Sequence, residues 1–482
     1  MSATHLFTSI SGPRPTPVLG WRGNLVRFLR DPVGYMAPLA RAHGDVVPFA
    51  GRGAGPVLVR EAHGGTVFAL GPVCSQQVFG QMPVFHSARI PGPPESRSFE
   101  RLTSGLLSMN EDRHRKQRRL LQPAFHKARI EGYRDTMVAM TERAVESWRP
   151  GEVRDLVAEM AHLTLAVANR TLFGLDTTPG EINLGQQIQE VLELSISPAA
   201  MVPLNLPFSP RRRLIETAAR TEASLRAVIT RKRAEGVGGD DVLSTLLATR
   251  DEDGDALTDD ELIGQLFVLF LAGHDTTKSA VAWTLFLLSE HPRVHGDLRD
   301  ELFGVLGGSA PRSDQMGELP LLDRVVKESL RLFPPAPFTG RLTVQATELA
   351  GVPIPAGMEV IVSPYCLHRY PDLYPEPQRF LPERWEKLAP SPFEYAPFGA
   401  GPRMCIGAAF SAQLLRTQLA MILQRFRPEL PPGTRIDTKV RAANLGARAA
   451  VPLRLVDRRG VIARPGGVRG TIRELVEFPA PA

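Results

Sequence analysis

One cysteine near the end of the chain lies in a setting that suits metal ligation. Cys405 occurs in the stretch FGAGPRMCIG, residues 398–407, and an amphipathic run, AAFSAQLLRTQLAMILQRF, follows at once. That run predicts a helix with the cysteine at its N-terminus, where unpaired N–H groups and the macrodipole favour a thiolate over a thiol. The three glycines of the stretch let the backbone approach a flat cofactor, and Phe398 can shield the sulfur from water. The alternative is an inert, buried packing cysteine.

A second candidate site lies in the longest helix that the sequence predicts, residues 258–289. Its middle, LFVLFLAGHDTTKSAVAWTLFLL, is apolar except for a central polar cluster, which indicates a buried helix and argues against a membrane span. Ala272 and Gly273 remove bulk, so the helix can bulge and leave room for a small ligand. Asp275 and Thr276 place an acid and a hydroxyl beside that gap. The alternative is a helix-packing glycine beside an incidental polar patch.

Two further pairs occur at helical spacing. In EDRHRKQRRLLQPAFH, residues 111–126, His114 and Arg118 are four apart and share one face of a predicted helix. Taken alone, this run also fits a solvated basic helix. In LLDRVVKESLRLFPP, residues 321–335, Glu328 and Arg331 are three apart. The apolar flanks favour a buried ion pair there, although the same spacing is common on surfaces.

Composition limits the classes of function. The chain has 482 residues, 43% of them hydrophobic, which is ample for a large core, and a net charge of +6 from seven lysines and fifty arginines against the acids. Arginine is spread along the chain, so a nucleic-acid partner has no specific support. Only three cysteines occur, which predicts a reducing compartment and no disulfide framework. The first thirty residues contain no apolar run typical of a signal peptide or membrane span, so we expect a protein without a membrane anchor.

Several stretches together resemble the cytochrome P450 family. The spacing Phe-x-x-Gly-x-Arg-x-Cys-x-Gly in residues 398–407 is similar to its haem-binding loop. AGHDTT is similar to its oxygen-activating segment, and FLPERW, residues 380–385, to the segment whose arginine completes a Glu-Arg-Arg triad. Residues 197–210 and their flanking helices resemble the lid over the access channel.

The resemblance implies one α+β domain, residues 1–456, that is predominantly helical, with a long central helix and small β-sheets on one side. Residues 457–482 would then be a C-terminal extension of unknown role. The protein is expected to be a cytoplasmic monomer.

The resemblance also assigns roles to single residues. Cys405 would be the axial ligand of haem b and favour O–O bond cleavage, and Asp275 and Thr276 would relay protons. The structural triad would be Glu328, Arg331 and Arg384. Haem contacts would come from His114, Arg118, Ala272, Arg341, Phe398, Gly399, Arg403 and Gly407. Substrate contacts would come from Val268, Leu271, Ala336, Phe338 and Ala449.

The implied activity is that of a haem-thiolate monooxygenase. It would insert one oxygen atom from O2 into a lipophilic terpenoid, fatty acid, steroid or polyketide by hydroxylation or epoxidation. Electrons would come from a separate ferredoxin and ferredoxin reductase, and Arg115, Lys116 and Arg119 would form a basic docking patch for the ferredoxin. The alternatives are a peroxide-driven peroxygenase, which would not need Asp275 and Thr276, a non-catalytic haem-binding sensor, and a plain helical scaffold without a chromophore.

Overall fold

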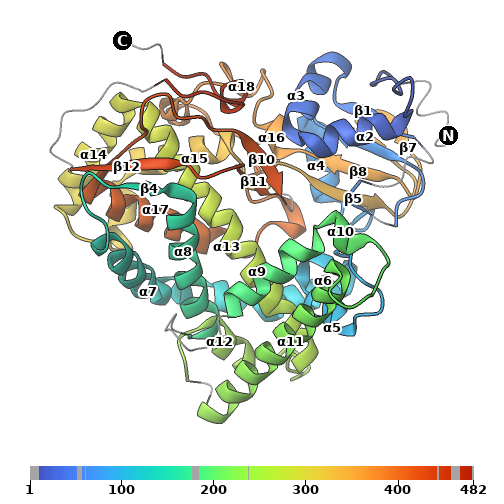
Figure 1. Ribbon diagram of the computed structural model, residues 1–482, viewed down its shortest axis with the longest axis horizontal. Helices are drawn as coiled ribbons and strands as arrows, with labels where there is room; N and C mark the ends of the chain where they lie inside the picture. The colour runs from blue at the N-terminus through green and yellow to red at the C-terminus, as the bar shows by residue number, and fades with distance from the viewer. Residues whose placement is uncertain are drawn as a thin grey trace.

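The structure is a computed structural model that describes residues 10–51, 57–59, 61–175, 184–236, 238–441, 444–457 and 467–479. Figure 1 shows helices filling most of the molecule, with the largest sheet at the upper right beside α2, α3 and α4. The helices are α2 (Trp21–Arg30), α3 (Pro32–His43), α4 (Pro72–Gly80), α5 (Arg97–Leu102), α6 (Glu111–Leu121), α7 (Lys127–Glu146), α8 (Leu156–Ala168), α9 (Leu184–Ser195), α10 (Pro198–Met201), α11 (Pro210–Glu235), α12 (Val242–Ala248), α13 (Asp259–Glu290), α14 (Pro292–Leu306), α15 (Pro320–Leu332), α16 (Pro364–Leu367), α17 (Ala408–Arg425) and α18 (Ile472–Leu475).

The central helix is α13, and its ends follow from local sequence. Thr258 and Glu261 form a capping box, in which Oγ1 of Thr258 accepts a hydrogen bond from the Glu261 N–H and the Glu261 carboxylate accepts one from the Thr258 N–H. Pro292 starts the next helix directly after it. Helix α13 runs through the middle of Figure 1 and packs against α8, α15 and α17. The predicted range of 258–289 is confirmed. Among the described residues, no helix is long and apolar enough to cross a membrane.

The strands form small sheets, as the resemblance implied. The largest has the order β1-β2-β8-β5-β3, in which β2 and β8 run parallel and the other neighbours antiparallel. A three-stranded sheet has the order β4-β12-β9, and β6-β7 and β10-β11 are hairpins. The strands are β1 (Val46–Ala50), β2 (Thr66–Ala69), β3 (Phe85–His86), β4 (Val153–Asp155), β5 (Thr339–Thr343), β6 (Thr347–Leu349), β7 (Val352–Ile354), β8 (Glu359–Val362), β9 (Phe426–Glu429), β10 (Thr438–Arg441), β11 (Asn444–Ala447) and β12 (Pro452–Asp457).

The predicted triad is present and buried. The carboxylate of Glu328 accepts hydrogen bonds from Nε and Nη2 of Arg331 at 2.9 and 2.8 Å, and from Nε of Arg384 at 2.9 Å. Arg331 also donates to the carbonyl oxygens of His368 and Pro377. Because these carbonyls belong to the long connection that leads to the cysteine loop, the triad ties α15 to that connection.

The described part of the C-terminal extension, residues 467–479, packs onto the helical core. Ile472 is fully buried, and the ring of Phe478 lies 5.9 Å from that of Phe286 in α13. The Glu477 N–H donates to the carbonyl oxygen of Gln378 at 3.0 Å. This part of the extension therefore shares its hydrophobic core with the rest of the chain.

Candidate cofactor and active site

The cysteine loop closes on itself through backbone hydrogen bonds. The Cys405 N–H donates to the carbonyl oxygen of Phe398 at 2.8 Å. Gly399 and Gly401 have φ values of 66° and 65°, a region that favours glycine. A Cβ on Gly401 would lie 2.3 Å from the carbonyl oxygen of Phe79 at the end of α4. These two glycines are therefore required by the loop's own conformation and, for Gly401, by its contact with α4.

Gly407 has a different role from the other two glycines. Its φ is −90°, so its backbone does not require glycine. A Cβ there would lie 4.0 Å from the Cys405 sulfur and 3.8 Å from the ring of Phe125. Of the three glycines, Gly407 is the one that leaves space beside the thiol.

The environment of the Cys405 thiol corrects one expectation. Burial raises its pKa, and a hydrogen bond from the Gly407 backbone and the charge of Arg118 only partly oppose this. Burial, the largest influence on this thiol, therefore opposes the lowering expected at a helix N-terminus. Burial raises the pKa of Cys74 to about 12 and that of Cys366 to about 11. Cys74 and Cys366 are buried, whereas Cys405 is half-buried, and coordination to a metal ion would deprotonate its thiol.

Four predicted cofactor contacts form one electrostatic cluster. His114 is buried and its pKa is lowered to about 4, first by burial and then by the charges of Arg403, Arg118 and Arg341. Burial and the charge of Arg403 lower the pKa of Arg341 to about 10, and burial lowers that of Arg403 to about 10. Arg403 donates to the side chain of Asn110, and Arg341 to that of Thr339. Within the described ranges, no carboxylate forms an ion pair with any of the three arginines.

This cluster fits a cofactor that carries carboxylates. Three guanidinium groups in a desolvated setting lack an anionic partner among the described residues, which is costly unless a bound anion supplies it. Nδ1 of His114 and Nε of Arg403 are buried without a hydrogen-bond partner. Each of the three arginines is half-buried, and burial lowers the pKa of each. A thiol and a cationic cluster are the donor set that haem, with its two propionates, requires.

One face of α13 carries several half-buried residues in its middle. Leu269, Ala272, Gly273 and Thr276 keep accessible surface although most of the helix is buried, and their spacing places them on one side. A Cβ on Gly273 would meet no atom within 4 Å. The expected bulge is absent, because α13 is α-helical from Asp259 to Glu290. Any space for a ligand beside this turn of α13 therefore comes from the small size of Ala272 and Gly273.

The Thr276 hydroxyl donates to the Ala272 carbonyl oxygen at 2.5 Å. This is the back-bond that any threonine in a helix can make. The carboxylate of Asp275 instead accepts from Nζ of Lys278 at 2.6 Å, and the side-chain amide of Asn444 in β11 donates to the Asp275 carbonyl at 2.9 Å. Sequence reasoning missed both partners. Lys278 could have been found from its three-residue spacing, whereas Asn444 has no local signal.

The predicted substrate contacts are placed unevenly. Val268 and Phe338 are buried, Leu271 is half-buried, and Ala336 and Ala449 are exposed. The Phe338 ring lies 5.3 Å from that of Phe28, within an aromatic cluster beside the large sheet. The assignment of these five residues to a substrate pocket stays a prediction.

Each cation of the predicted basic docking patch has an acidic partner. Arg115 pairs with Asp112 in the same helix. Lys116 and Arg119 pair at 2.8 Å with Asp251 and Glu252, which precede α13. These pairs reduce the net positive charge of the patch, and ferredoxin docking there stays a prediction.

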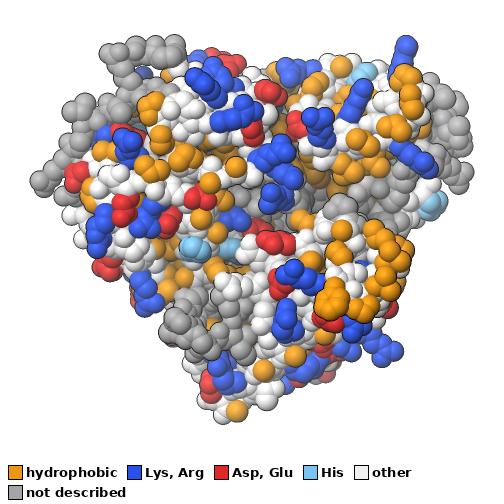
Figure 2. Space-filling view, viewed as in Figure 1, with side chains coloured by type: hydrophobic (Ala, Val, Ile, Leu, Met, Phe, Trp, Pro, Cys, Tyr) orange, Lys and Arg blue, Asp and Glu red, His pale blue; other side chains and the backbone are white. Residues whose placement is uncertain are grey.

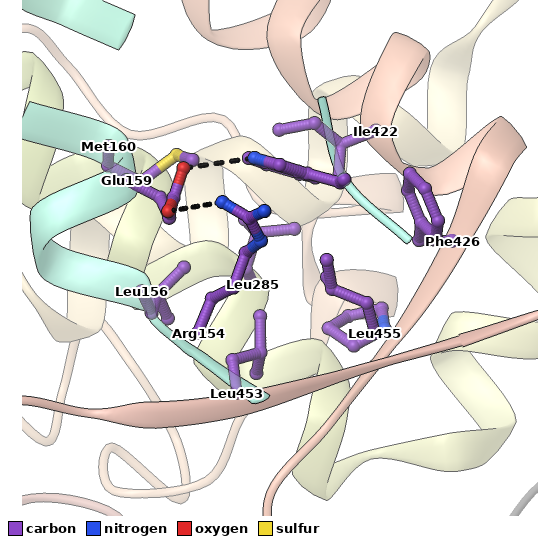
Figure 3. Close-up of a pocket in the computed structure, with 11 residues that line it drawn as sticks. Arg154, Leu156, Glu159, Met160, Leu285, Ile422, Phe426, Leu453 and Leu455 are labelled. Atoms are coloured by element: carbon purple, nitrogen blue, oxygen red, sulfur yellow. Dashed lines mark hydrogen bonds and ion pairs between the residues drawn. The ribbon is translucent and has the colours of Figure 1, made fainter. Parts of the chain in front are cut away.

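A small hollow elsewhere in the fold has no chemistry of its own (Figure 3). It lies between α8, α13, α17 and the β4-β12-β9 sheet, and Leu285, Phe426 and Leu453 are among its apolar walls. Glu159 accepts hydrogen bonds from Nε1 of Trp148 at 2.9 Å and from Nη1 of Arg154 at 2.8 Å. None of the predicted site residues lines this hollow, and its polar groups satisfy one another.

Comparison with known proteins decides the family. The profile of the family described as Cytochrome P450 matches residues 55–450. The chain belongs to the cytochrome P450 family. Cyclooctatin synthase of Streptomyces melanosporofaciens is 35% identical over 447 residues, covering 90% of this chain and 93% of that protein. Pentalenene oxygenase of Streptomyces avermitilis is 31% identical over 438 residues, covering 89% of this chain and 93% of that protein.

Solved P450 structures share the fold. The heme domain of cytochrome P450DA superposes with a TM-score of 0.81 at 25% identity, covering 93% of this chain and 97% of that chain. Retinoic-acid-bound cyanobacterial CYP120A1 has a TM-score of 0.78 at 24% identity, covering 93% of this chain and all of that one. The expected α+β P450 fold is thus confirmed, and so is the reaction class: this P450 is a haem-dependent monooxygenase, an oxidoreductase.

Proposed function

We propose that this P450 hydroxylates or epoxidises a polycyclic terpenoid at a haem b held by Cys405. The observation that carries the proposal is the half-buried Cys405 thiol near Arg118, which with Arg341 and Arg403 surrounds His114 and lacks a described carboxylate partner. The terpenoid class is supported by relatives named pentalenene oxygenase and cyclooctat-9-en-7-ol 5-monooxygenase, the latter 32% identical over 442 residues.

Each residue of the site has a distinct task in this proposal. Bound haem supplies the activation of O2, from which one atom enters a C–H or C=C bond and the other leaves as water. Cys405 would ligate the iron through its sulfur. The guanidinium groups of Arg118, Arg341 and Arg403 would bind the propionates, and neutral His114 would donate a hydrogen bond to one of them. Thr276 and Asp275 would hold and pass on protons at Oγ1 and at the carboxylate.

An exposed apolar segment supports a lipophilic substrate. Between α10 and α11 four side chains are 46, 57, 59 and 102% exposed, namely Val202, Leu204, Leu206 and Phe208. Figure 2 shows apolar side chains gathered at the right of the molecule over this connection. An apolar surface of this kind is typical of a binding or entry site. We assign to it the entry of the substrate toward the accessible face of α13.

Electrons are proposed to come from a separate ferredoxin and its reductase. This proposal rests on the resemblance to P450s that receive electrons from separate proteins. Basic side chains are scattered among acidic ones over the face shown in Figure 2, so no single basic block on that face marks the docking site.

The test combines spectra with turnover. The reduced protein should show the haem-thiolate band with carbon monoxide, and Cys405→Ser should abolish it. With ferredoxin, reductase and a terpenoid substrate, Thr276→Ala should keep haem content and substrate affinity but divert NAD(P)H electrons to hydrogen peroxide, while Thr276→Ser retains product. Full coupling in the alanine variant would remove Thr276 from the mechanism. Turnover with peroxide alone at an equal rate would favour a peroxygenase.

A further inference from the structure

We propose that Thr471, in the C-terminal extension, is a positioning residue for the substrate site and limits which carbon atoms of the substrate are oxidised. It fixes the β10–β11 hairpin against the turn of α13 that holds Asp275 and Thr276. This inference rests on the proposed monooxygenase function and adds a specificity-determining residue to it. In Figure 1 the hairpin lies between α18, at the top of the molecule, and α13.

The extension is hydrogen-bonded to the start of β10. The Thr438 N–H donates to Oγ1 of Thr471 at 2.9 Å. In the opposite direction, the Thr471 N–H donates to the carboxylate of Asp437 at 3.0 Å. The backbones also pair, since the Ile436 N–H donates to the Arg469 carbonyl oxygen at 2.9 Å. Thr471 therefore supplies the side-chain oxygen that holds the start of β10 against the extension.

The extension is itself firmly held and lies very close to β10. Gly470 has a φ of 98°, which favours glycine, and a Cβ there would lie 2.3 Å from the Ile436 carbonyl oxygen. Four apolar side chains of the extension are buried, namely Val468, Ile472, Leu475 and Val476. Because these side chains are part of the core, the extension is a fixed support for the hairpin.

The other strand of the hairpin, β11, contacts α13 directly. The side-chain amide of Asn444 donates to the Asp275 carbonyl oxygen at 2.9 Å and to the Ser279 hydroxyl at 3.1 Å. The carbonyl oxygen of Leu445 accepts a hydrogen bond from Nε1 of Trp283 at 2.9 Å. Strand β11 is thus bound to α13 at three positions, each about one helical turn from the next.

The hairpin connects Thr471 to these contacts on α13. Thr438, which Thr471 binds, pairs with Ala447, and Arg441 pairs with Asn444. The two pairs lie three residues apart along β10, which is about 10 Å. A two-stranded hairpin is marginally stable by itself, so the placement of this one depends on its contacts with neighbouring elements. The hydrogen bond to Thr471 therefore helps to determine where Asn444 lies.

The contacts with β11 lie on the side of α13 that carries Ala272 and Thr276. Each residue of an α-helix is turned by about 100°, so Trp283 lies about 20° from Thr276 around the helix axis. Ser279 lies about 20° from Ala272. The hairpin therefore borders, at its C-terminal end, the half-buried face on which the proposed function places the substrate. Its position limits how a substrate can lie against that face.

Hydrogen exchange followed by mass spectrometry tests the contact without turnover. In the haem-containing protein without substrate, Thr471→Val should speed the exchange of the β10 and β11 amides by roughly 2- to 13-fold, the effect of losing one net hydrogen bond. Thr471→Ser keeps the hydroxyl and should exchange like the parent protein. Ile472→Val is the matched control, because it shortens a buried side chain of the same extension and keeps the Thr471 hydroxyl. It should leave the exchange of the hairpin unchanged.

Product analysis tests the effect on the substrate. With ferredoxin, reductase and pentalenene as the probe, Thr471→Val should raise the ratio of minor to major oxidation products by roughly twofold or more, because a looser hairpin admits other substrate orientations. Haem content and the carbon monoxide band should stay as in the parent protein. Asn444→Ala should change the ratio in the same way. In that background Thr471→Val should add nothing, because Thr471 acts through the hairpin.

The outcomes separate this inference from the function on which it rests. Faster exchange together with a changed product ratio, both restored by Thr471→Ser, supports the role of Thr471. Unchanged exchange, an unchanged product ratio, or effects additive with Asn444→Ala would overturn it and leave the extension as a part of the core alone. If the parent protein lacks the carbon monoxide band or does not oxidise pentalenene, the proposed function is what fails, and the exchange comparison still decides whether Thr471 holds the hairpin.

Discussion

Replacing Glu328 by glutamine should destabilise this P450 more than any change of equal size on its surface. Glu328 and Arg331 are both fully buried. The carboxylate accepts five hydrogen bonds, two from Arg331 and one each from Nε of Arg384, the Leu381 N–H and Nε1 of Trp385, at 2.8–3.0 Å. Glutamine keeps the shape, but it removes the negative charge and turns one acceptor into a donor that faces other donors.

The expected loss follows from the charge left behind. Removing one partner of a buried ion pair costs about 3–5 kcal/mol, because the remaining charge is uncompensated. Arg331 cannot move to water, since its other N–H groups donate to the carbonyl oxygens of His368, Pro377 and Arg379. Against a total unfolding free energy of about 5–15 kcal/mol, this loss is large. It should also loosen the connection that leads to the cysteine loop.

The assay is urea unfolding of the haem-containing protein followed by far-UV circular dichroism. Glu386→Gln is the matched control, because Glu386 pairs with Arg324 of the same helix, α15, but is itself half exposed. That variant should cost about 0–1 kcal/mol. A Glu328→Gln variant within 1 kcal/mol of the parent would refute the argument that the buried charge controls stability.

The pH dependence has a definite sign. Burial, the largest influence, acts to raise the pKa of Glu328, but the charges and hydrogen bonds of Arg331 and Arg384 hold it below its ordinary value of 4.5. A lowered folded-state pKa means that the carboxylate contributes its full stability above the unfolded-state pKa and loses it as the pH falls through the folded-state value. The difference in unfolding free energy between the parent protein and the Glu328→Gln variant should therefore be constant at neutral pH and become smaller below about pH 4.

Three other predictions concern the cysteine loop, α13 and the C-terminal extension. Gly401→Ala should yield protein that binds little haem, because its Cβ would lie 2.3 Å from the Phe79 carbonyl oxygen. A Cβ at position 273 would meet no atom within 4 Å, so Gly273→Ala should keep haem and stability. It should weaken substrate affinity in spectral titrations. Ile472→Ala should lower the unfolding free energy by about 2–5 kcal/mol, and Ile472→Val by about 0.5–1.5 kcal/mol. An unchanged Ile472→Ala variant would show that the extension does not contribute to the core.

Local sequence was enough to predict the parts that depend on short-range spacing. The capping residue and Pro292 delimit α13, and the glycine pattern marks the cysteine loop, because backbone conformation and helix ends depend on neighbours a few residues away. Glu328 and Arg331 face the same way for the same reason, and the resemblance supplied Arg384.

The family followed from the sequence alone through the cysteine loop and the AGHDTT string. Only the tertiary structure decided how the charges are paired, with Lys116 and Arg119 bound to acids that precede α13. The tertiary structure also decided how buried each group is, and burial raises the pKa of the Cys405 thiol. It also decided that residues 467–479 complete the core. The physical reason is that pairing and desolvation act over a few ångströms in space, between groups that can be more than a hundred residues apart in the chain.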